Sequence, residues 1–330
     1  MIRESLIRRT AKITSGLLFG AGLALGADAA LAGLPKMLAG ATGDGAAHLR
    51  LSQGFGPSPY APQVLYPVTA APRPAWMLEA IRPAILETAA AQSGPSRPVI
   101  AICIDDLGPN LAGTAKAMAL PNEVALSFLP YAETAPAQAQ EAAARGHLVL
   151  AHVPMQALNG KEPGAMGLKP EMTPEEITRR MGWNLARVPG LVGINNHEGS
   201  RFTADAAALE AVMASLRARH LFFFDSRTGP KSAVGHVARA AGVMTAARDV
   251  FLDDDPSPEA VNAELENLAR EAKRNGVAIA IGHPHDVTLA LLAKWLDEDH
   301  GVTLVPLDEA MRLKAERRKV AGGGAATAVR

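Results

Sequence analysis

Short apolar runs recur between residues 99 and 313 and alternate with segments that carry helix signals. These runs predict buried strands, and strands that alternate with helices form parallel βαβ units with right-handed crossovers. About eight such units in roughly 215 residues predict an α/β fold, either a (β/α) barrel or near-barrel or an open doubly wound sheet. The predicted strands are residues 99–106, 124–129, 147–153, 191–196, 221–225, 243–245, 277–281 and 302–305.

Three helix starts are marked by capping residues. Thr173 is followed by a proline and two glutamates, which is a capping box with proline at the first helical position. Thr203 is a candidate cap for a helix over residues 204–219. Ser257, followed by proline, opens a helix that Gly276 closes. These signals place helices between the predicted strands.

Polar residues stand at the carboxyl ends of the runs, where both kinds of α/β sheet carry their active sites. Three of the runs carry a histidine there and two carry carboxylates. A single histidine is more often structural, but three at equivalent positions are hard to explain by packing alone. The residues at these ends are Asp105, Asp106, Ser127, Pro130, His152, Asn195, Asn196, His197, Asp225, Ser226, Arg227, Arg248, Asp249, His283 and His285.

One carboxylate and two imidazoles on a rigid rim form a common catalytic zinc set with an open position for water. Asp106, His152 and His197 fit the three ligand positions. Asp105 then serves as general base, provided that the strand ends at Gly108 so that both carboxylates face one site. The predicted cofactor is a divalent metal; the ligand types favour zinc and leave other divalent ions open.

Other polar residues at the rim are candidates for proton transfer and substrate contacts. Either His283 or His285 is placed to protonate a leaving group. Arg201 and Arg227 are candidates to bind substrate oxygens, and a structural ion pair is an equal alternative for each. Asp225 and His285 complete the predicted substrate-binding set.

Two loops beside these strands are assigned by composition. Asp249, Asp253, Asp254 and Asp255 lack the spacing and the turn glycine of a calcium loop, so they predict a solvated loop. Residues 159–171 are rich in glycine and proline and predict either a lid beside His152 or a plain connection.

The two ends of the chain differ in composition from the middle. Residues 1–32 combine basic residues, a short apolar run and Ala-x-Ala sites, which predicts a signal peptide or membrane anchor and export to the periplasm or envelope. Residues 33–97 predict a partly disordered Pro/Ala/Gly-rich linker, residues 98–315 the folded domain, and residues 316–330 a disordered tail. A formal net charge of zero gives no indication of a nucleic-acid partner.

Six segments carry most of the polar residues named above. They are IAICIDDLG (100–108), LSFLPYA (126–132), LAHVPMQ (150–156), GINNHEGSRFT (193–203), LFFFDSRT (221–228) and AIAIGHPH (278–285). In this order they resemble the divergent polysaccharide deacetylase family, a branch of the polysaccharide deacetylase superfamily. The resemblance implies a distorted (β/α)7-8 barrel that removes acetyl groups from N-acetylated sugars with the help of a metal.

The resemblance also implies roles for single residues. In the superfamily an Asp-Asp pair supplies base and ligand, which corresponds to Asp105 and Asp106, and a late catalytic histidine corresponds to His283. The superfamily's second ligand histidine follows the first by four positions, but here His152 is followed by Gln156. His197 is therefore the candidate for the second imidazole.

A further departure lies after the Asn-Asn-His sequence, where the divergent branch tends to have an apolar residue. This chain has Glu198, which we expect to face solvent. The predicted function is an exported metal-dependent hydrolase that deacetylates an N-acetylated sugar or cell-wall glycan. The alternatives are a non-catalytic envelope module that binds glycan or protein on the same barrel, and a metal-dependent amidase.

Overall fold

The computed structural model describes residues 97–326, and the side chains of residues 97–319. The predicted signal peptide or anchor and the predicted linker, apart from residue 97, therefore lie outside the described residues. No helix in the described range combines the length and the apolar character needed to cross a membrane.

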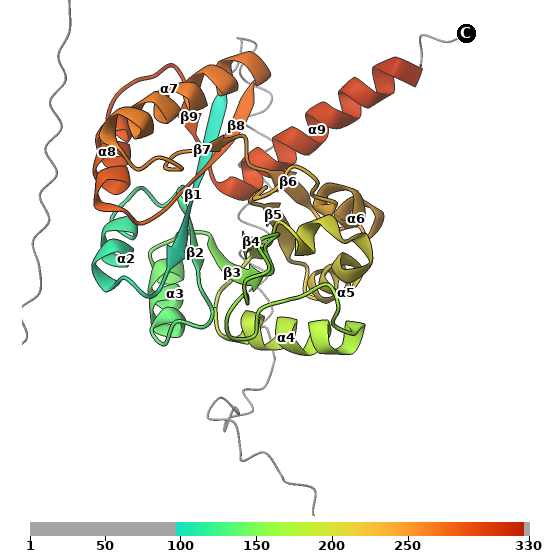
Figure 1. Cartoon of the computed structure of the whole chain (residues 1–330). Coiled ribbons are helices and arrows are strands. Elements are labelled where there is room, and N and C mark those ends of the chain that lie inside the picture. Colours follow the sequence, from blue (N-terminus) through green and yellow to red (C-terminus); the bar gives the residue numbers. More distant parts are fainter. Residues whose placement is uncertain (1–96, 327–330) are drawn as a thin grey trace, which may run out of the picture. The chain divides into compact units, whose positions relative to one another are not determined.

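The described residues form one sheet of nine strands, and every strand pair in it is parallel. The strand order is β6-β5-β4-β3-β2-β1-β8-β7, and β9 pairs with β1 (Figure 1). Each predicted strand lies within two residues of an observed one at both ends. The strands are β1 (Val99–Leu107), β2 (Ala125–Phe128), β3 (Val149–Met155), β4 (Gly193–Glu198), β5 (Phe222–Asp225), β6 (Thr245–Ala247), β7 (Val250–Phe251), β8 (Val277–Gly282) and β9 (Thr303–Leu304).

The two outermost strands of that order, β6 and β7, are consecutive in the chain. β6 pairs with β5 at one edge of the sheet, and β7 pairs with β8 at the other edge. The single segment from Thr245 to Phe251, which we call the closing segment, therefore connects both edges. This arrangement confirms the distorted α/β barrel, and β7 is a strand that the sequence pattern missed.

Helices follow most of the strands, as Figure 1 shows. Thr173 caps α4 by accepting a hydrogen bond from the Glu176 amide, and Ser257 caps α7 in the same way. The cap expected at Thr203 is wrong, because Asp205 caps α5 and Thr203 lies within a 3₁₀ turn. The helices are α2 (Leu111–Ala117), α3 (Ala135–Ala144), α4 (Pro174–Ala186), the 3₁₀ turn η1 (Phe202–Ala204), α5 (Ala206–Arg217), α6 (Val234–Ala240), α7 (Pro258–Asn275), α8 (Asp286–Leu296) and α9 (Leu307–Ala326).

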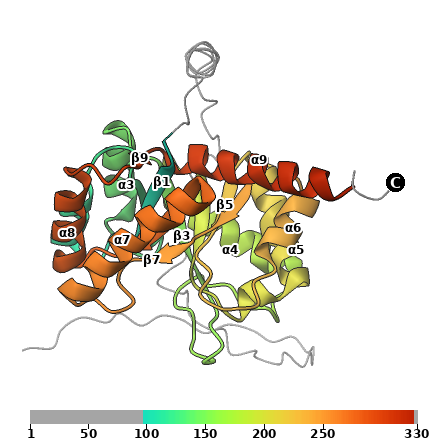
Figure 2. The same cartoon turned by 90° about the horizontal axis from the view of Figure 1, so that it is seen from above.

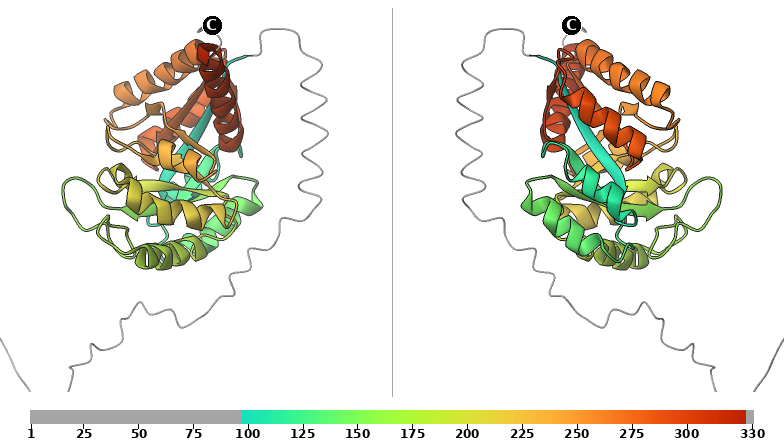
Figure 3. Two further views of the ribbon diagram at one scale, coloured as in Figure 1. Left: turned by 90° about the vertical axis from the view of Figure 1, so that its right-hand side faces the viewer. Right: turned by 90° about the vertical axis from the view of Figure 1, so that its left-hand side faces the viewer.

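The two faces of the sheet pack against different partners. Ile100, Ile102 and Ile104 of β1 belong to the large core that includes the helices α3–α8, whereas Ala101 and Cys103 point to the opposite face. That second face is covered by the first turns of α9, through its residues Leu307, Ala310 and Met311. Helix α9, in red, runs across the strands in Figure 2 and lies close to β1, in cyan, in both views of Figure 3.

Helix α9 continues to Ala326, past residue 315, at which the sequence placed the end of the domain. The segment 307–319 is rich in alanine, leucine, lysine, arginine and glutamate, which are strong helix formers. Once the first turns are nucleated by packing on the sheet, each further residue adds one hydrogen bond at low cost. The Gly/Ala composition that predicted a disordered tail therefore did not mark the end of the helix.

Candidate active site

Both carboxylates at the end of β1 face the same site because the strand is irregular there. The register of β1 on β2 shifts between Ile104 and Leu107, and Asp106 has a left-handed backbone with φ +56°. In a regular strand neighbouring side chains point to opposite faces. The left-handed backbone at Asp106 instead turns its side chain toward the same site as Asp105. Aspartate tolerates that conformation better than most residues. Gly108 follows with φ +121°, and a Cβ there would lie 2.7 Å from the Cβ of Ala132.

Asp106, His152 and His197 come together at the carboxyl ends of β1, β3 and β4. The Oδ1 atom of Asp106 lies 3.2 Å from His152 Nε2 and 2.9 Å from His197 Nδ1. One ligand atom from each residue lies within 4.8 Å of the others. We call these three residues the ligand cluster. The other carboxylate, Asp105, is adjacent, with its Oδ2 atom 3.7 Å from His152 Nε2.

The ligand cluster contains oxygen and nitrogen atoms that are available to coordinate a metal. Asp106 Oδ1 is buried and, among the described residues, has no aligned hydrogen-bond partner. His152 uses its other ring nitrogen, Nδ1, to donate to Asn195 Oδ1 over 2.8 Å, which leaves Nε2 free as a ligand. Two nitrogens and one oxygen that converge in this way suit zinc and related divalent ions.

The electrostatics of the ligand cluster favour a cation. Burial raises the pKa of Asp106, but the imidazoles of His152 and His197 outweigh it and hold this pKa well below its ordinary value. Burial lowers the pKa of His152, but Asp105 and Asp106 reverse the effect and raise it. The carboxylates therefore attract positive charge to this point, either as a proton on an imidazole or as a metal ion.

Asn195 holds Asp105 and His152 in position. Its Nδ2 atom donates to both oxygens of Asp105, at 2.9 and 2.8 Å, while its Oδ1 atom accepts from His152 and from Ser127. Cys103 Sγ, on the same face of β1, donates to Asp105 over 3.2 Å. A buried amide with donors and acceptors all in use fixes its neighbours. Asn195 therefore orients the predicted base and one predicted ligand at once.

His283, at the end of β8, forms a second Asp–His pair. Its Nδ1 atom lies 2.9 Å from Asp253 Oδ1, and its backbone amide donates to Asp253 Oδ2 over 2.7 Å. Burial lowers the pKa of His283, but the hydrogen bond that it donates to Asp253 and the charges of Asp105, Asp253 and Asp106 raise it to about 9. His283 is therefore protonated at neutral pH, as a general acid must be. Asp253 is buried, so the expectation of a solvated acidic loop is wrong at this residue.

Arg201 contacts other residues of the chain, as expected from the structural ion pair that was the alternative to a substrate-binding role. Its guanidinium donates to the side chains of Gln156 and Glu171. Gln156 is buried in the position where the superfamily pattern has a second histidine, and its backbone carbonyl accepts from the amides of Arg201 and Phe202. The ion pair between Arg201 and Glu171 anchors the loop between β3 and α4. This loop projects from the body of the domain in Figure 2. The side chain of Glu198 is exposed, as expected.

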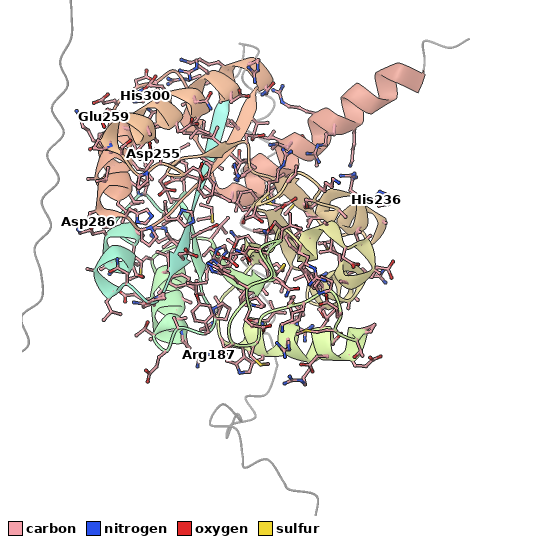
Figure 4. The ribbon with its side chains drawn as sticks, in the orientation of Figure 1. Arg187, His236, Asp255, Glu259, Asp286 and His300 are labelled. Atoms are coloured by element: carbon pink, nitrogen blue, oxygen red, sulfur yellow. The ribbon has the colours of Figure 1, made fainter. Side chains whose placement is uncertain are left out.

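Tyr131 lies on the loop after β2. Burial raises its pKa, and the charges of Asp106 and Glu198 raise it further, so the phenol is within electrostatic range of both carboxylates. Arg187, directly after α4 and labelled in Figure 4, holds this loop in place. Its guanidinium donates to the backbone carbonyls of Pro130 and Ala132. Nothing in the local sequence of α4 indicates this contact.

None of the remaining predicted substrate-binding residues belongs to the ligand cluster. Asp225 is buried and accepts from the Arg227 amide and the Ser232 hydroxyl. Arg227 is exposed, with a left-handed backbone at φ +48°. His285 is exposed next to His283, with 6.0 Å between the ring centroids.

Sequence reasoning left three residues of this site without a role: Asn195, Asp253 and Tyr131. Asn195 and Tyr131 lie in or directly after segments that were singled out, at the carboxyl ends of β4 and β2. Their position was the available signal. Asp253 follows the unrecognised strand β7, so no signal placed it at a strand end.

The profile of the family described as "divergent polysaccharide deacetylase" matches residues 102–311. The chain belongs to this family. The matched range contains every residue of the ligand cluster together with Asp105, Asp253 and His283.

The chain is also similar to proteins of known sequence and structure. An uncharacterized protein of Haemophilus influenzae is 37% identical over 197 residues, which cover 60% of this chain and 70% of that protein. The uncharacterized protein YibQ of Escherichia coli is 36% identical over 197 residues, 60% of this chain and 62% of its own length. The crystal structure of the uncharacterized protein ATU2773 from Agrobacterium tumefaciens has a TM-score of 0.61 and 29% identity, covering 67% of this chain and 93% of that one.

Proposed function

We propose that this divergent polysaccharide deacetylase domain is a metal-dependent hydrolase that removes acetyl groups from an N-acetylated sugar or glycan. The observation that supports the proposal most directly is the ligand cluster, in which a buried carboxylate oxygen without a hydrogen-bond partner meets two imidazole nitrogens. Asp106, His152 and His197 would hold a divalent ion, and zinc is the ion that we favour. Such an ion supplies Lewis acidity and lowers the pKa of bound water.

The residues around the cluster have complementary roles. Asp105, oriented by Asn195, accepts the proton of the attacking water. His283, protonated and held by Asp253, donates a proton to the sugar nitrogen as the amide bond breaks. Amide hydrolysis requires one group that accepts a proton from the attacking water and one that donates a proton to the leaving nitrogen.

The first test is the metal content of the full-length protein, compared with His197→Ala and with His236→Ala as a control. His236 is an exposed histidine on α6, far along the chain from the cluster (Figure 4). We expect about one equivalent of a transition metal in the wild type and in the control, and a large loss in His197→Ala. Absence of metal in the wild type after incubation with zinc would favour the non-catalytic binding module.

The second test is release of acetate from chito-oligosaccharides by the metal-loaded protein, with Asp105→Asn as the inactive reference. We expect release by the wild type only. Cleavage of acetylated peptides in place of sugars would assign the metal-dependent amidase instead.

We also propose that residues 1–32 direct the protein to the periplasm or cell envelope, on the basis of their composition. A fusion of residues 1–97 to alkaline phosphatase, which folds only in an oxidising compartment, tests this. Activity of the fusion is expected, and its absence would contradict export.

A further inference from the structure

A cavity of about 390 Å³ lies beside the closing segment, between β6, α6 and the distal part of α9. It is on the α6 side of the domain, which His236 marks in Figure 4. Neither the ligand cluster nor the pair His283–Asp253 lines it. The cavity is thus a feature that the proposed hydrolase chemistry leaves unused.

Three arginines from three different elements line this cavity. Arg227 follows β5, Arg239 is in the last turn of α6, and Arg318 is on α9. All three are exposed, and none forms an ion pair with another residue in the described range. Guanidinium groups present paired N–H donors that match the oxygens of phosphate and carboxylate. Three guanidinium groups against the single carboxylate of Asp225 on this wall point to an external anion.

Thr245, on the β6 wall of the same cavity, gives an independent indication. The residue is only 7% exposed, and its buried Oγ1 atom has no hydrogen-bond partner among the described residues. Buried hydroxyls without a partner are uncommon in folded proteins, and a bound ligand is one explanation for them. Because this Oγ1 atom is closed off from solvent, it can donate to an anion in the cavity only when the threonine side chain rotates.

The electrostatics agree with an excess of positive charge at this place. Burial lowers the pKa of Lys314, and Arg318 and Arg227 lower it further, although its partner Asp249 opposes them. The one carboxylate on the wall, Asp225, has both oxygens engaged, by the Arg227 amide and the Ser232 hydroxyl. It therefore fixes the loop that carries Arg227, and one carboxylate against three guanidinium groups leaves the wall with an excess of positive charge.

We propose that this cavity binds a phosphate group, either as free phosphate or as the phosphate of a small organic ester. Three cations and a hydroxyl match a doubly charged anion with several acceptor oxygens better than a monocarboxylate. The volume also exceeds that of one phosphate ion, so an ester has room for its organic part.

Calorimetric titration of the full-length protein with inorganic phosphate, glycerol 3-phosphate and acetate tests the proposal. Because phosphate can also bind to a metal, the titrations are made after treatment with a chelator. We expect binding of at least one of the two phosphates and none of acetate. The tighter of the two binders identifies the source of the phosphate group.

Substitutions locate the binding. Arg239→Gln and Arg318→Gln change exposed residues on separate helices, and each is expected to weaken binding about tenfold or more. Arg270→Gln, on α7 and away from the cavity, is the matched control and should bind as the wild type does. Thr245→Val tests the hydroxyl and should weaken binding by a smaller factor. No binding of either phosphate, or binding that Arg239→Gln and Arg318→Gln leave unchanged, would overturn the proposal.

Discussion

The described residues include two groups of one aspartate and two histidines, and the carboxylates of these groups differ in their hydrogen bonding. In both groups, one ligand atom per residue lies within 4.8 Å of the others. In the ligand cluster, Asp106 Oδ1 has no aligned donor and two ring nitrogens face it. In the second group, the carboxylate of Asp253 accepts from the His283 ring, the His283 amide and the Thr288 hydroxyl.

The difference shows that residue types alone do not define a metal site. A carboxylate whose oxygens are filled by N–H and O–H donors has little capacity left for a cation, whereas an unfilled buried carboxylate oxygen can still coordinate one. The second group instead raises the pKa of one imidazole, which is useful for proton transfer. The predictions below test this distinction, from the largest expected effect to the smallest.

Asp106→Asn and Asp253→Asn remove equivalent charges from the two groups. Asparagine tolerates the left-handed backbone at position 106, so the fold should persist. We expect Asp106→Asn to weaken metal binding by more than about 100-fold and to abolish hydrolysis, because a direct ligand is lost. Asp253→Asn should keep its metal. Metal analysis of both variants would contradict the distinction if they lost metal equally.

Asp253→Asn should instead change the pH dependence of activity. A general acid works only when protonated, so activity in the wild type is expected to fall as the pH rises through the His283 pKa of about 9. Without the Asp253 carboxylate, the pH at which activity falls (the alkaline limb of the pH–rate profile) should move toward 6.5, the ordinary pKa of histidine. A pH–rate profile measures this, and an unchanged alkaline limb would remove His283 from the proton-transfer role.

The same pKa shift predicts a pH dependence of stability. The pKa of His283 is higher in the folded state than in the unfolded state. The stabilisation that protonated His283 gives to the fold is therefore complete below about pH 6.5 and is lost as the pH rises through about 9. The loss is at most about 3 kcal/mol in the free energy of unfolding. Urea unfolding at several pH values should show a smaller dependence in Asp253→Asn than in the wild type.

Asn195→Ala should have an intermediate effect, since Asn195 acts through its neighbours. We expect kcat to fall about 10- to 100-fold, as for other residues that orient metal ligands. The free energy of unfolding should fall by about 1–3 kcal/mol, because Asp105 loses buried donors. Ser127→Ala, which removes one of the donors to Asn195, is the milder control. If Ser127→Ala costs more activity than Asn195→Ala, the orienting role is wrong.

His285→Ala should have the smallest effect. This histidine is the exposed third member of the second group. We expect unchanged metal content and a change in the free energy of unfolding within about 0.5 kcal/mol. Loss of metal in this variant would show that the second group, and not only the ligand cluster, binds a cation.

Much of the fold and of the site could be predicted from the sequence. The strands agree within two residues because a buried parallel strand requires a continuous apolar run, which is a local pattern. The ligand cluster was predicted as a set because the ends of parallel strands share one edge of the sheet. Its members, Asp106, His152 and His197, therefore had to lie near one another whatever the details of packing.

The roles of other residues depended on contacts between distant segments. Arg201 was predicted either to bind substrate oxygens or to form a structural ion pair, and the structure shows it bound to Gln156 and Glu171. Asp253 was taken for part of a solvated loop, and it is the buried partner of His283, 30 residues away. An arginine or an aspartate in a loop has the same local sequence whether its partner is water or a buried side chain.

By itself, the sequence determined the alternation of strands and helices, the family, and which polar residues stand at the strand ends, because these follow from local period and chain order. Only the tertiary structure decided that Asp106 turns back through a left-handed conformation to share a site with Asp105. It also decided that Asn195 links the Asp105 carboxylate to His152, and that the first turns of α9 cover the second face of the sheet. Those outcomes depend on which donors, acceptors and apolar faces meet after the chain closes, and that is a property of long-range packing.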